Sequence, residues 1–422
     1  MSAPTAVEYV SYADATGYGQ AAVGYVRLLV DAGLHVHWKP YLNDALWNGR
    51  IGPAHDVAEL SRGRAALMAR GQSASGNGLT ALVEATSRPV APELRILHML
   101  PLFWPMNMAL APGVAHAGMT VWETDRLPAK WLPALGAVSH LMVPSEHNAQ
   151  ILSDARADGA ALPGVSVVPH LCRSAPHLPS QVRLAALAKW LRIGPADTVF
   201  YSINAWDPRK RLGALISGFA RSFSEEDPAV LVVKTNRRTW FDDPMSPPGD
   251  RDVQNTVAAI LAKAAADTGR PPARVAVIAD DEISDSLIDG LHAISHCFVT
   301  LSRCEGFGLG CFDAATYGRP VIAVGYGGPL DYLGAAWPGR IGHHMVRCDA
   351  PPGFGSFDPG QSWPEPHDAE AFALMRAFLQ DERPFREAAA AGALSIKERF
   401  GAGVIGKRLL AALSLQPGER AV

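Results

Sequence analysis

Short apolar segments alternate with amphipathic segments along most of this chain, which has 422 residues. Apolar runs such as residues 7–12 and 229–234 predict buried strands. Segments with helical spacing of their apolar residues follow, for example residues 212–223 and 253–268. This alternation predicts the α/β class, with doubly wound parallel sheets that helices cover on both faces.

The alternation occurs in two series, and a segment rich in proline and polar residues separates them at residues 169–178. A domain of ~100–200 residues is typical, so the length of the chain allows two domains. We expect an N-terminal Rossmann-like domain over residues 1–172 and a second domain over residues 173–399.

Composition excludes several classes of protein. The net charge of −3 gives no basic footprint for nucleic acid, so nucleic acid is not an expected partner. Five cysteines without a CxxC pair argue against a disulfide framework and a zinc site, and favour a reducing, cytoplasmic compartment. The first residues lack the basic and apolar regions of a secretory signal, and no uncharged apolar run reaches the ~18 residues of a membrane span.

Two glycines, Gly17 and Gly19, follow the first predicted strand and precede a helix that is expected to begin near residue 21. Their spacing loosely matches the dinucleotide fingerprint. The next strand, however, ends at Lys39 without the acidic residue that would bind a ribose, which argues against NAD. Two alternatives remain: a tight turn that needs glycine for its geometry, or a turn that contacts the donor substrate.

A glycine-rich segment after residue 304 indicates a phosphate-binding loop. Glu305 opens this segment, and Asp313 lies eight positions later, in what we expect to be the first turn of a helix. The glycines expose backbone amides at the positive end of that helix, which suits a diphosphate. Asp313 is then placed to bind ribose hydroxyls, and Glu305 to accept from sugar hydroxyls or to stabilise the loop. The predicted donor-binding loop residues are Gly306, Phe307, Gly308 and Leu309.

The stretch EGFGLGCFDAATYGRPVIA, which begins at Glu305, resembles the donor-site signature of retaining GT-B glycosyltransferases, in particular glycosyltransferase family 4. Asp313 replaces the family's second glutamate, and Gly310 replaces its usual proline. The resemblance is close in the second half of the chain and loose in the first. It implies two Rossmann-like domains that face each other across a cleft, with a last helix, about residues 400–422, that packs back on the first domain.

A basic segment after residue 203 resembles the family's second donor motif, R…RKG. The family's lysine falls on Lys210, which the resemblance makes a catalytic residue. Its arginine falls at Asn204 or the next residue, and neither is basic, so Arg209 or Arg211 would have to compensate. Asn204 and Arg209 are accordingly predicted to bind the donor. Lys234, in a family-like VVKTN segment, is either a ligand of the donor or a solvated strand-end residue.

In the first half, Glu123 stands near a position where many members of the family have a histidine close to the reacting sugar. Glu123 is predicted either to orient the acceptor or the transferred sugar, or to be a buried residue that caps the following turn. His98 is a weaker candidate, because a histidine among apolar neighbours is usually a core residue. The tryptophan-bearing residues 100–115 form either core or a surface that faces an acceptor or a membrane.

The resemblance implies transfer of a sugar from a UDP- or GDP-sugar to a hydroxyl of a glycan, a lipid-linked or a small-molecule acceptor, with retention. It also implies no metal and no cofactor, so the paired acids Asp242 and Asp243, and Asp280 and Asp281, are expected to be solvated loop residues. A cytoplasmic enzyme is expected, with peripheral association at the inner membrane surface as an option. The alternatives are a GT-B-fold sugar-nucleotide epimerase and a catalytically weak subunit that binds nucleotide sugars.

Overall fold

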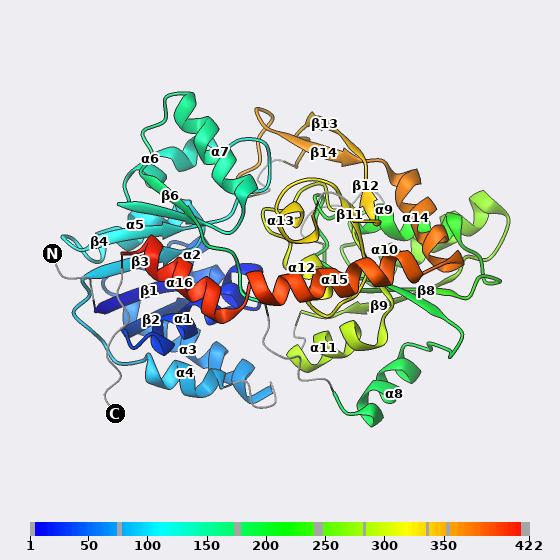
Figure 1. The fold of residues 1–422 in the computed structure, drawn as a ribbon, viewed down its shortest axis with the longest axis horizontal. Coiled ribbons are helices and arrows are strands. Elements are labelled where there is room, and N and C mark those ends of the chain that lie inside the picture. Colours follow the sequence, from blue (N-terminus) through cyan, green and yellow to red (C-terminus); the bar gives the residue numbers. More distant parts are fainter. Residues whose placement is uncertain are drawn as a thin grey trace. The chain divides into compact units, whose positions relative to one another are not determined.

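The computed structural model describes residues 5–73, 78–172, 179–239, 248–281, 284–334, 337–351 and 355–414. The chain divides into two compact units, whose elements are labelled in Figure 1. The first unit consists of Met1–Trp122, Arg126–Ser174 and Glu398–Val422, and the second consists of Glu123–Asp125 and Ala175–Lys397. Glu123 therefore groups with the second unit, although the segments on both sides of Glu123–Asp125 belong to the first.

The first unit contains a six-stranded parallel sheet in the order β2-β1-β3-β4-β5-β6. Its strands are β1 (Ala6–Tyr12), β2 (His35–Tyr41), β3 (Leu94–His98), β4 (Ala115–Met119), β5 (His140–Val143) and β6 (Gly164–Val167). The strand order reverses at β1, because β2 lies on one side of β1 and β3 lies on the other. Such a topological switch point is where open α/β sheets bind ligands, at the carboxyl ends of the strands.

Helices cover this first sheet. They are α1 (Gly17–Asp31), α2 (Asn43–Trp47), α3 (Asp56–Ser73), α4 (Leu79–Ala85), α5 (Trp104–Ala109), α6 (Leu132–Gly136), α7 (Glu146–Ala157) and α16 (Ala402–Ala412). The C-terminal helix α16 packs against α1, where a Cβ at Gly406 would lie 3.5 Å from a methyl carbon of Leu28. Among the described residues, no helix has both the length and the apolar character needed to cross a bilayer.

The second unit contains a six-stranded parallel sheet in the order β12-β11-β10-β7-β8-β9. Its strands are β7 (Thr198–Ile203), β8 (Ala229–Thr235), β9 (Arg274–Ala279), β10 (Cys297–Val299), β11 (Val321–Val324) and β12 (Arg340–Ile341). Its switch point lies between β7 and β10, which are direct neighbours. A separate antiparallel ribbon pairs β13 (His343–Arg347) with β14 (Ser362–Pro366).

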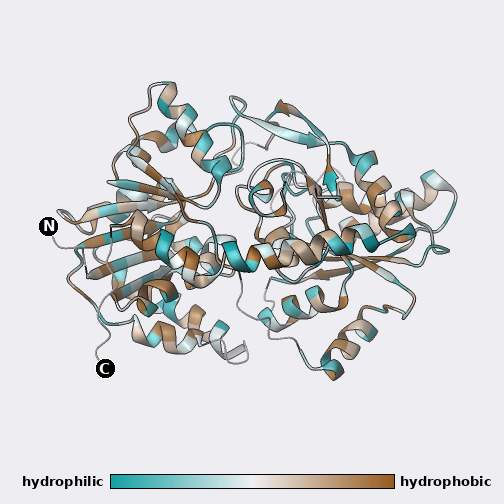
Figure 2. Ribbon diagram, in the orientation of Figure 1, coloured by the Kyte–Doolittle hydropathy of each residue, from teal (hydrophilic) through white to brown (hydrophobic). Residues whose placement is uncertain are grey.

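The helices of the second unit are α8 (Gln181–Trp190), α9 (Leu212–Ser222), α10 (Val253–Thr268), α11 (Asp285–Ile294), α12 (Leu309–Thr316), α13 (Pro329–Leu333), α14 (Asp368–Gln380) and α15 (Arg383–Arg399). Apolar residues of the strands and of α9, α10 and α14 form one continuous core. In Figure 2 brown dominates the strands of both sheets and alternates with teal along the helices. The strands are apolar because helices cover both of their faces.

The predicted doubly wound α/β class is confirmed in each unit, and the helix predicted at residues 253–268 lies where expected. Strand β4 ends at Met119, three residues before Trp122. The backbone of Trp122 instead bonds the side chain of Asn148, through N–H to Oδ1 at 2.8 Å and through C=O to Nδ2 at 2.7 Å. These bonds replace the pairing that a continued strand would have made.

The predicted glycine turn after β1 also needs correction, because α1 begins at Gly17 and has Thr16 as its N-cap. Gly17 and Gly19 therefore lie in the first helical turn rather than before the helix. A Cβ at Gly19 would lie 2.1 Å from the carbonyl oxygen of Asp14. Gly19 thus permits a close approach of the helix to the loop, which favours the geometric alternative for this residue.

Candidate active site

Two loops meet at the switch point of the second sheet. One loop follows β7 and carries residues 204–211, and the other follows β10 and carries residues 300–308. The backbone N–H of Arg303 donates to the carbonyl oxygen of Arg209 at 2.9 Å, which joins the loops directly. Asn204 adds a second link, because its Nδ2 donates to Ser202 Oγ at 2.9 Å and to Thr300 Oγ1 at 3.4 Å.

Lys210 lies beside Glu305 at this junction. The Lys210 Nζ forms an ion pair and hydrogen bond with Glu305 Oε1. The Lys210 backbone is fixed by Asp207, whose carbonyl oxygen and Oδ1 accept from the Lys210 N–H at 3.1 and 3.0 Å. Burial alone would raise the pKa of Glu305, but the charges of Lys210 and Arg209 lower it to about 2. Glu305 is therefore a carboxylate at neutral pH.

Arg209 lies between two carboxylates. One guanidinium nitrogen donates to the carbonyl oxygen of Cys304 at 2.6 Å and lies 3.4 Å from Glu305 Oε2. The other terminal nitrogen lies 3.6 Å from Glu123 Oε1. Although burial lowers the pKa of Arg209, Glu123 and Glu305 raise it above its usual value. Burial raises the pKa of Glu123 and outweighs the opposing charge of Arg209.

The four charged side chains thus alternate in sign, from Glu123 through Arg209 and Glu305 to Lys210. We call these four residues the switch-point cluster. The structure brings together three of the predicted catalytic residues, Lys210, Glu305 and Glu123, with the predicted donor residue Arg209. Two cations at a strand edge can bind a phosphate-containing anion through charge-assisted hydrogen bonds, while their carboxylate partners keep them in place when no anion is bound.

The glycine loop from Gly306 to Gly308 is held in one conformation. Gly308 has φ of +82° and is the N-cap of α12, so a left-handed residue opens that helix. The loop rests on a second glycine turn, since Gly328 N–H donates to the carbonyl oxygen of Glu305 at 2.9 Å. The Tyr332 hydroxyl donates to the carbonyl oxygens of Phe307 at 3.0 Å and Gly308 at 2.9 Å. The positive N-terminal end of α12, from Leu309, therefore begins directly after the loop that carries Glu305.

Asp313 does not lie where the sequence placed it. Because α12 begins at Leu309, Asp313 is in the second turn of the helix, and the first turn has no acidic residue. The Asp313 side chain is also buried. Gly308 caps the helix with its left-handed conformation, so the N-terminal end is formed by backbone N–H groups rather than by this carboxylate.

Arg211, one of the two arginines that could replace the missing family arginine, is paired with carboxylates outside the switch-point cluster. Its guanidinium donates to both carboxylate oxygens of Asp368, at 2.6 and 3.0 Å, and a nitrogen lies 2.9 Å from Glu365 Oε1. These partners direct Arg211 to the β13–β14 ribbon rather than to Glu305. Of the two arginines considered for this role, only Arg209 lies in the switch-point cluster.

Lys234 lies beside the loop that carries Asn204. It is the penultimate residue of β8, and its carbonyl oxygen accepts from Asn204 N–H at 3.1 Å. Burial lowers the pKa of Lys234, while Asp281 and Asp280 act in the opposite direction. Asp242 and Asp243 lie outside the described residues. Within the described part of the chain, no group of three or more His, Cys, Asp or Glu side chains is arranged to hold a metal ion.

The candidates of the first unit lie at its own switch point or in its core. Gly17 and Gly19 belong to α1 of that unit. His98 is buried at the end of β3, and its Nδ1 is 2.8 Å from the Tyr9 hydroxyl. Burial, with a contribution from His170, lowers the pKa of His98 to about 3, so this ring is neutral at pH 7. Trp104 is fully buried, which favours the core alternative for its segment.

Sequence reasoning missed three residues that shape the site: Arg303, Tyr332 and Glu365. Arg303 precedes Glu305 by two positions, so its proximity to the motif was a usable signal. Tyr332 follows the second glycine turn at Gly327 and Gly328, shortly after the end of the motif. The contact of Glu365 with the site could not be seen locally, because its hydrogen-bonding partner Arg303 lies 62 positions away.

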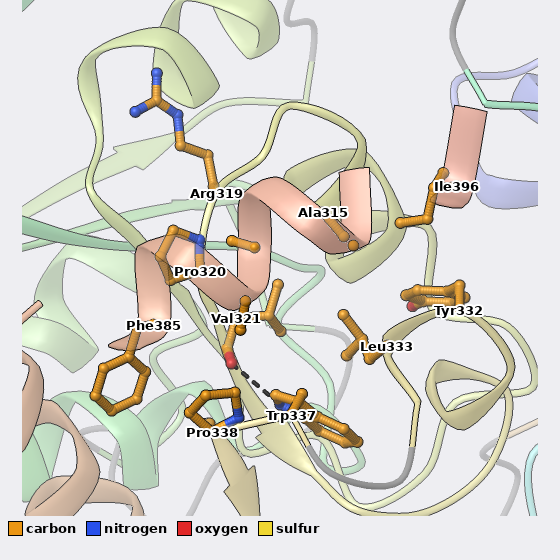
Figure 3. A pocket seen from close by; sticks show the side chains of 14 residues that line it. Ala315, Arg319, Pro320, Val321, Tyr332, Leu333, Trp337, Pro338, Phe385 and Ile396 are labelled. Atoms are coloured by element: carbon orange, nitrogen blue, oxygen red, sulfur yellow. Dashed lines mark hydrogen bonds between the residues drawn. The ribbon is translucent and has the colours of Figure 1, made fainter. Parts of the chain in front are cut away.

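A small cavity of about 40 Å³ lies between α15 and the segments α12, β11 and α13 (Figure 3). Its walls include Tyr332, Trp337, Phe385 and Ile396. In Figure 3 the guanidinium of Arg319 extends away from the other side chains, and Trp337 Nε1 donates to the carbonyl oxygen of Val321 at 3.2 Å. The cavity has room for a few water molecules but not for a nucleotide, so it is a packing gap behind the glycine loop.

No protein-family model matches the sequence, and no curated protein matches it. Solved structures do match the fold. HepE from Anabaena in complex with UDP is 14% identical with a TM-score of 0.61, over 97% of this chain and 99% of that chain. Sucrose-phosphate synthase from Thermosynechococcus elongatus is 13% identical with a TM-score of 0.60, over 96% and 97%. A glycosyltransferase from Rickettsia africae is 12% identical with a TM-score of 0.61, over 97% of both chains. The chain therefore has the GT-B fold of these proteins.

Proposed function

We propose that this chain is a retaining glycosyltransferase that moves a sugar from a nucleoside diphosphate sugar to an acceptor hydroxyl. The observation that carries the proposal is the switch-point cluster, in which Lys210 and Arg209 lie beside the glycine loop that opens α12. The resemblance to glycosyltransferase family 4 supports the same reading. HepE, which shares the fold, was solved with UDP and with UDP-glucose, and this favours a UDP-sugar as the first donor to test.

The donor diphosphate would bind where two sources of positive charge meet. Lys210 and Arg209 supply full charges, and the N-terminal end of α12 supplies the partial charge of its peptide dipoles. Glu305, which neutralises both cations in this structure, would then turn to the hydroxyls of the donor sugar. Asn204 would hold the end of β7 against β10 while the donor is bound.

The reaction breaks the bond between the anomeric carbon and the β-phosphate oxygen and forms a bond to the acceptor oxygen. Negative charge grows on the departing oxygen, where Lys210 and Arg209 would stabilise it more strongly than in the ground state. The acceptor hydroxyl proton passes to that phosphate oxygen, so the products are the glycoside and the nucleoside diphosphate. No separate base is needed in this scheme, and the departing and entering groups share one face of the sugar, which gives retention.

Two carboxyl groups have subsidiary roles in the proposal. Glu123, which lies 3.6 Å from Arg209, would hydrogen-bond a hydroxyl of the transferred sugar or of the acceptor and so orient it. We keep Asp313 as a donor-site residue because it lies on α12. Its place in the second turn puts it farther from the N-terminal end of the helix than the sequence predicted. Gly17 and Gly19 are retained only as candidate contacts of the first unit.

We further propose that the protein cations act without a metal ion or cofactor and that the enzyme works in the cytoplasm. All five cysteines are free thiols, which supports a reducing compartment. A glycan, a lipid-linked sugar or a small molecule would supply the acceptor hydroxyl, and lipid-linked acceptors would bring the enzyme to the membrane surface.

The proposal is tested by incubating the protein with a panel of UDP- and GDP-sugars, with and without acceptors, and measuring nucleoside diphosphate release. A transferase releases the nucleotide with at least one donor, faster with acceptor present, and EDTA leaves the rate unchanged. Formation of an epimeric nucleotide sugar without release would identify an epimerase. Tight donor binding with neither release nor epimerisation would identify a binding subunit, and both of these outcomes contradict the proposed transfer.

A further inference from the structure

Glu365, on strand β14, lies between two arginines that flank the two loops of the site. Its Oε2 accepts from Arg303 Nε at 2.7 Å, and its Oε1 lies 2.9 Å from a guanidinium nitrogen of Arg211. Arg211 directly follows Lys210, and Arg303 precedes Glu305 by two residues. One carboxylate therefore connects both loops from the side of the ribbon, through Arg211 and Arg303.

A backbone bond closes this connection into a ring. The N–H of Arg303 donates to the carbonyl oxygen of Arg209 at 2.9 Å, and Arg209 is joined through Lys210 to Arg211 along the chain. Glu365 completes the ring between the two arginine side chains. The distance between Lys210 and Glu305 is thus fixed from two sides, by the backbone bond and by the carboxylate.

We propose that Glu365 is a positioning residue for sugar transfer, which bridges Arg211 and Arg303 and so sets the position of Lys210 relative to Glu305. This inference rests on the proposed function. Glu365 acts through the two arginines and does not touch the substrate.

The geometry of Arg211 shows why the loop needs such support. Arg211 has φ of +52°, a left-handed conformation that side-chain-bearing residues adopt only when their surroundings hold them there. Its bonds to Asp368 and its ion pair with Glu365 supply that hold. Lys210 directly precedes Arg211, so a change in the conformation of Arg211 moves the lysine.

The ribbon that carries Glu365 is itself firmly placed. Glu365 pairs with His344 in the register of β13 and β14. The guanidinium of Arg303 lies over the ring of Trp363, 4.6 Å from its centroid, and Trp363 is fully buried. Because the ribbon is packed in place, the contacts of Glu365 with Arg211 and Arg303 hold the two loops in a defined position.

Removing the bridge should leave the fold intact. Arg211 keeps Asp368 as a partner, and Arg303 keeps Asp349, whose Oδ1 lies 3.0 Å away. Neither arginine becomes a buried unpaired charge when Glu365 is neutralised. Glu365→Gln thus breaks the link between the loops but keeps the ion pairs of Arg211 with Asp368 and of Arg303 with Asp349. A loss of activity in this variant can therefore be told apart from a loss of stability.

The test compares Glu365→Gln with Asp267→Asn, a matched control in the same unit. Asp267 also bridges two cations, Arg221 at 2.8 Å and Lys263 at 3.1 Å, but on the surface and away from the site loops. We expect Glu365→Gln to lower kcat by ~10- to 100-fold, because small displacements of catalytic groups have effects of that size. The donor KM should change by less than about threefold, since the charges that bind the ground state remain.

A double-mutant cycle with Lys210→Ala distinguishes positioning of the lysine from a general structural role. It measures the effect of Glu365→Gln on kcat in the presence and in the absence of Lys210. If Glu365 acts through the lysine, Glu365→Gln has no further effect on kcat once Lys210 is gone. Arg303→Lys keeps the positive charge but lacks the planar guanidinium group, so it should cause the same loss of kcat. This variant replaces Glu365→Gln in the test if Glu365→Gln fails to fold.

Three outcomes would overturn the inference while the proposed function stands. They are a Glu365→Gln rate equal to that of Asp267→Asn, an equal loss of kcat with and without Lys210, and a loss that a fall in Tm fully explains. If the wild-type protein transfers sugar from no donor, the proposed function fails and the role of Glu365 fails with it.

Discussion

Both units contain a cluster of opposite charges with little exposure to solvent, but the clusters lie at different places on their sheets. In the first unit, Glu8 of β1 is ion-paired with Arg95 of β3, and its Oε1 lies 3.2 Å from His37 Nδ1 and 3.4 Å from Lys39 Nζ on β2. Glu8 is the third residue of the seven-residue β1, so this cluster lies within the sheet. The switch-point cluster of the second unit lies in the loops that follow β7 and β10.

Position along the strand decides what such a cluster can do. The Arg95 side chain is 1% exposed, and neighbouring strands and helices cover it, so no ligand reaches it. The Lys210 side chain is 13% exposed at the carboxyl edge, where α/β sheets bind ligands. Similar ion pairs thus hold one sheet together and form a candidate binding site on the other.

The switch point of the first unit differs again, because it carries hydroxyls and a neutral ring. The Tyr18 hydroxyl is 2.9 Å from Thr120 Oγ1, and the ring of Tyr18 lies 5.4 Å from that of His98. His98 and Thr120 are buried, so only the half-buried Tyr18 is open to a ligand at this edge, and its hydroxyl suits a neutral, hydroxyl-bearing one, whereas the switch-point cluster suits an anion. We propose on this basis that the first edge serves the acceptor and the second the nucleotide donor.

The largest expected effect is on the first cluster. Arg95→Met removes the cation that pairs with Glu8 and leaves that carboxylate buried, so the free energy of unfolding should fall by about 3–5 kcal/mol. Urea unfolding of the wild type and the variant measures the change. Arg88→Met, at an exposed arginine of the same unit, is the control. A loss no larger than that of the control would mean that the cluster does not hold the sheet together.

Lys210→Ala should have the converse effect, on catalysis rather than stability. Loss of one cation at the leaving phosphate should lower kcat/KM by ~100- to 1000-fold, a cost of about 3–4 kcal/mol of transition-state stabilisation. Lys263→Ala, at an exposed lysine of α10, is the matched control. Unchanged kcat/KM for Lys210→Ala would remove the lysine from the site and contradict the comparison.

The dependence of thermal stability on pH in the acid range gives a third test. The pKa of Glu305 is lowered from its usual 4.5 to about 2, so its stabilising contribution is present above pH 4.5 and is lost as the pH falls toward 2. Glu305→Gln resembles the protonated form at every pH. The difference in Tm between the wild type and Glu305→Gln should therefore be largest near pH 7 and shrink below pH 4.5. A constant difference from pH 7 to pH 3 would mean that the ion pair with Lys210 adds nothing.

Tyr18→Phe should have the smallest effect. It removes the hydroxyl that is 2.9 Å from Thr120 Oγ1 and accepts from Val121 N–H at 3.2 Å, which should cost about 1 kcal/mol of stability. If the first switch point binds the acceptor, the acceptor KM rises in this variant while UDP affinity stays the same. Calorimetry and steady-state kinetics measure both. A change in UDP affinity alone would contradict the division of roles between the two edges.

Local patterns in the sequence predicted the repeating elements and the core of the site. The apolar periodicity of residues 253–268 matches α10, and the glycine-rich motif correctly placed Glu305 in a loop before a helix. These features depend on neighbouring residues, so the sequence contains what is needed to find them. Lys210 was identified instead through the resemblance of its basic segment to the R…RKG motif of the glycosyltransferase family.

Features that depend on distant residues could not be predicted. Trp122, which follows β4, is bonded through its backbone to Asn148 of α7, 26 positions away. Arg211 was an open candidate until the structure placed Asp368 and Glu365 beside it. In each case tertiary contacts select one of several conformations or partners that the local sequence allows equally well.

Binding of nucleoside diphosphates compared with their parent nucleosides tests the central claim most directly. Calorimetry with UDP, uridine, GDP and guanosine isolates what the diphosphate contributes. If the switch-point cluster binds the diphosphate, one diphosphate binds at least ~100-fold more tightly than its nucleoside, as two charge-assisted hydrogen bonds would give. In Lys210→Ala that difference shrinks while nucleoside affinity is unchanged. Equal affinity of diphosphate and nucleoside for the wild-type protein would contradict the assignment of this site.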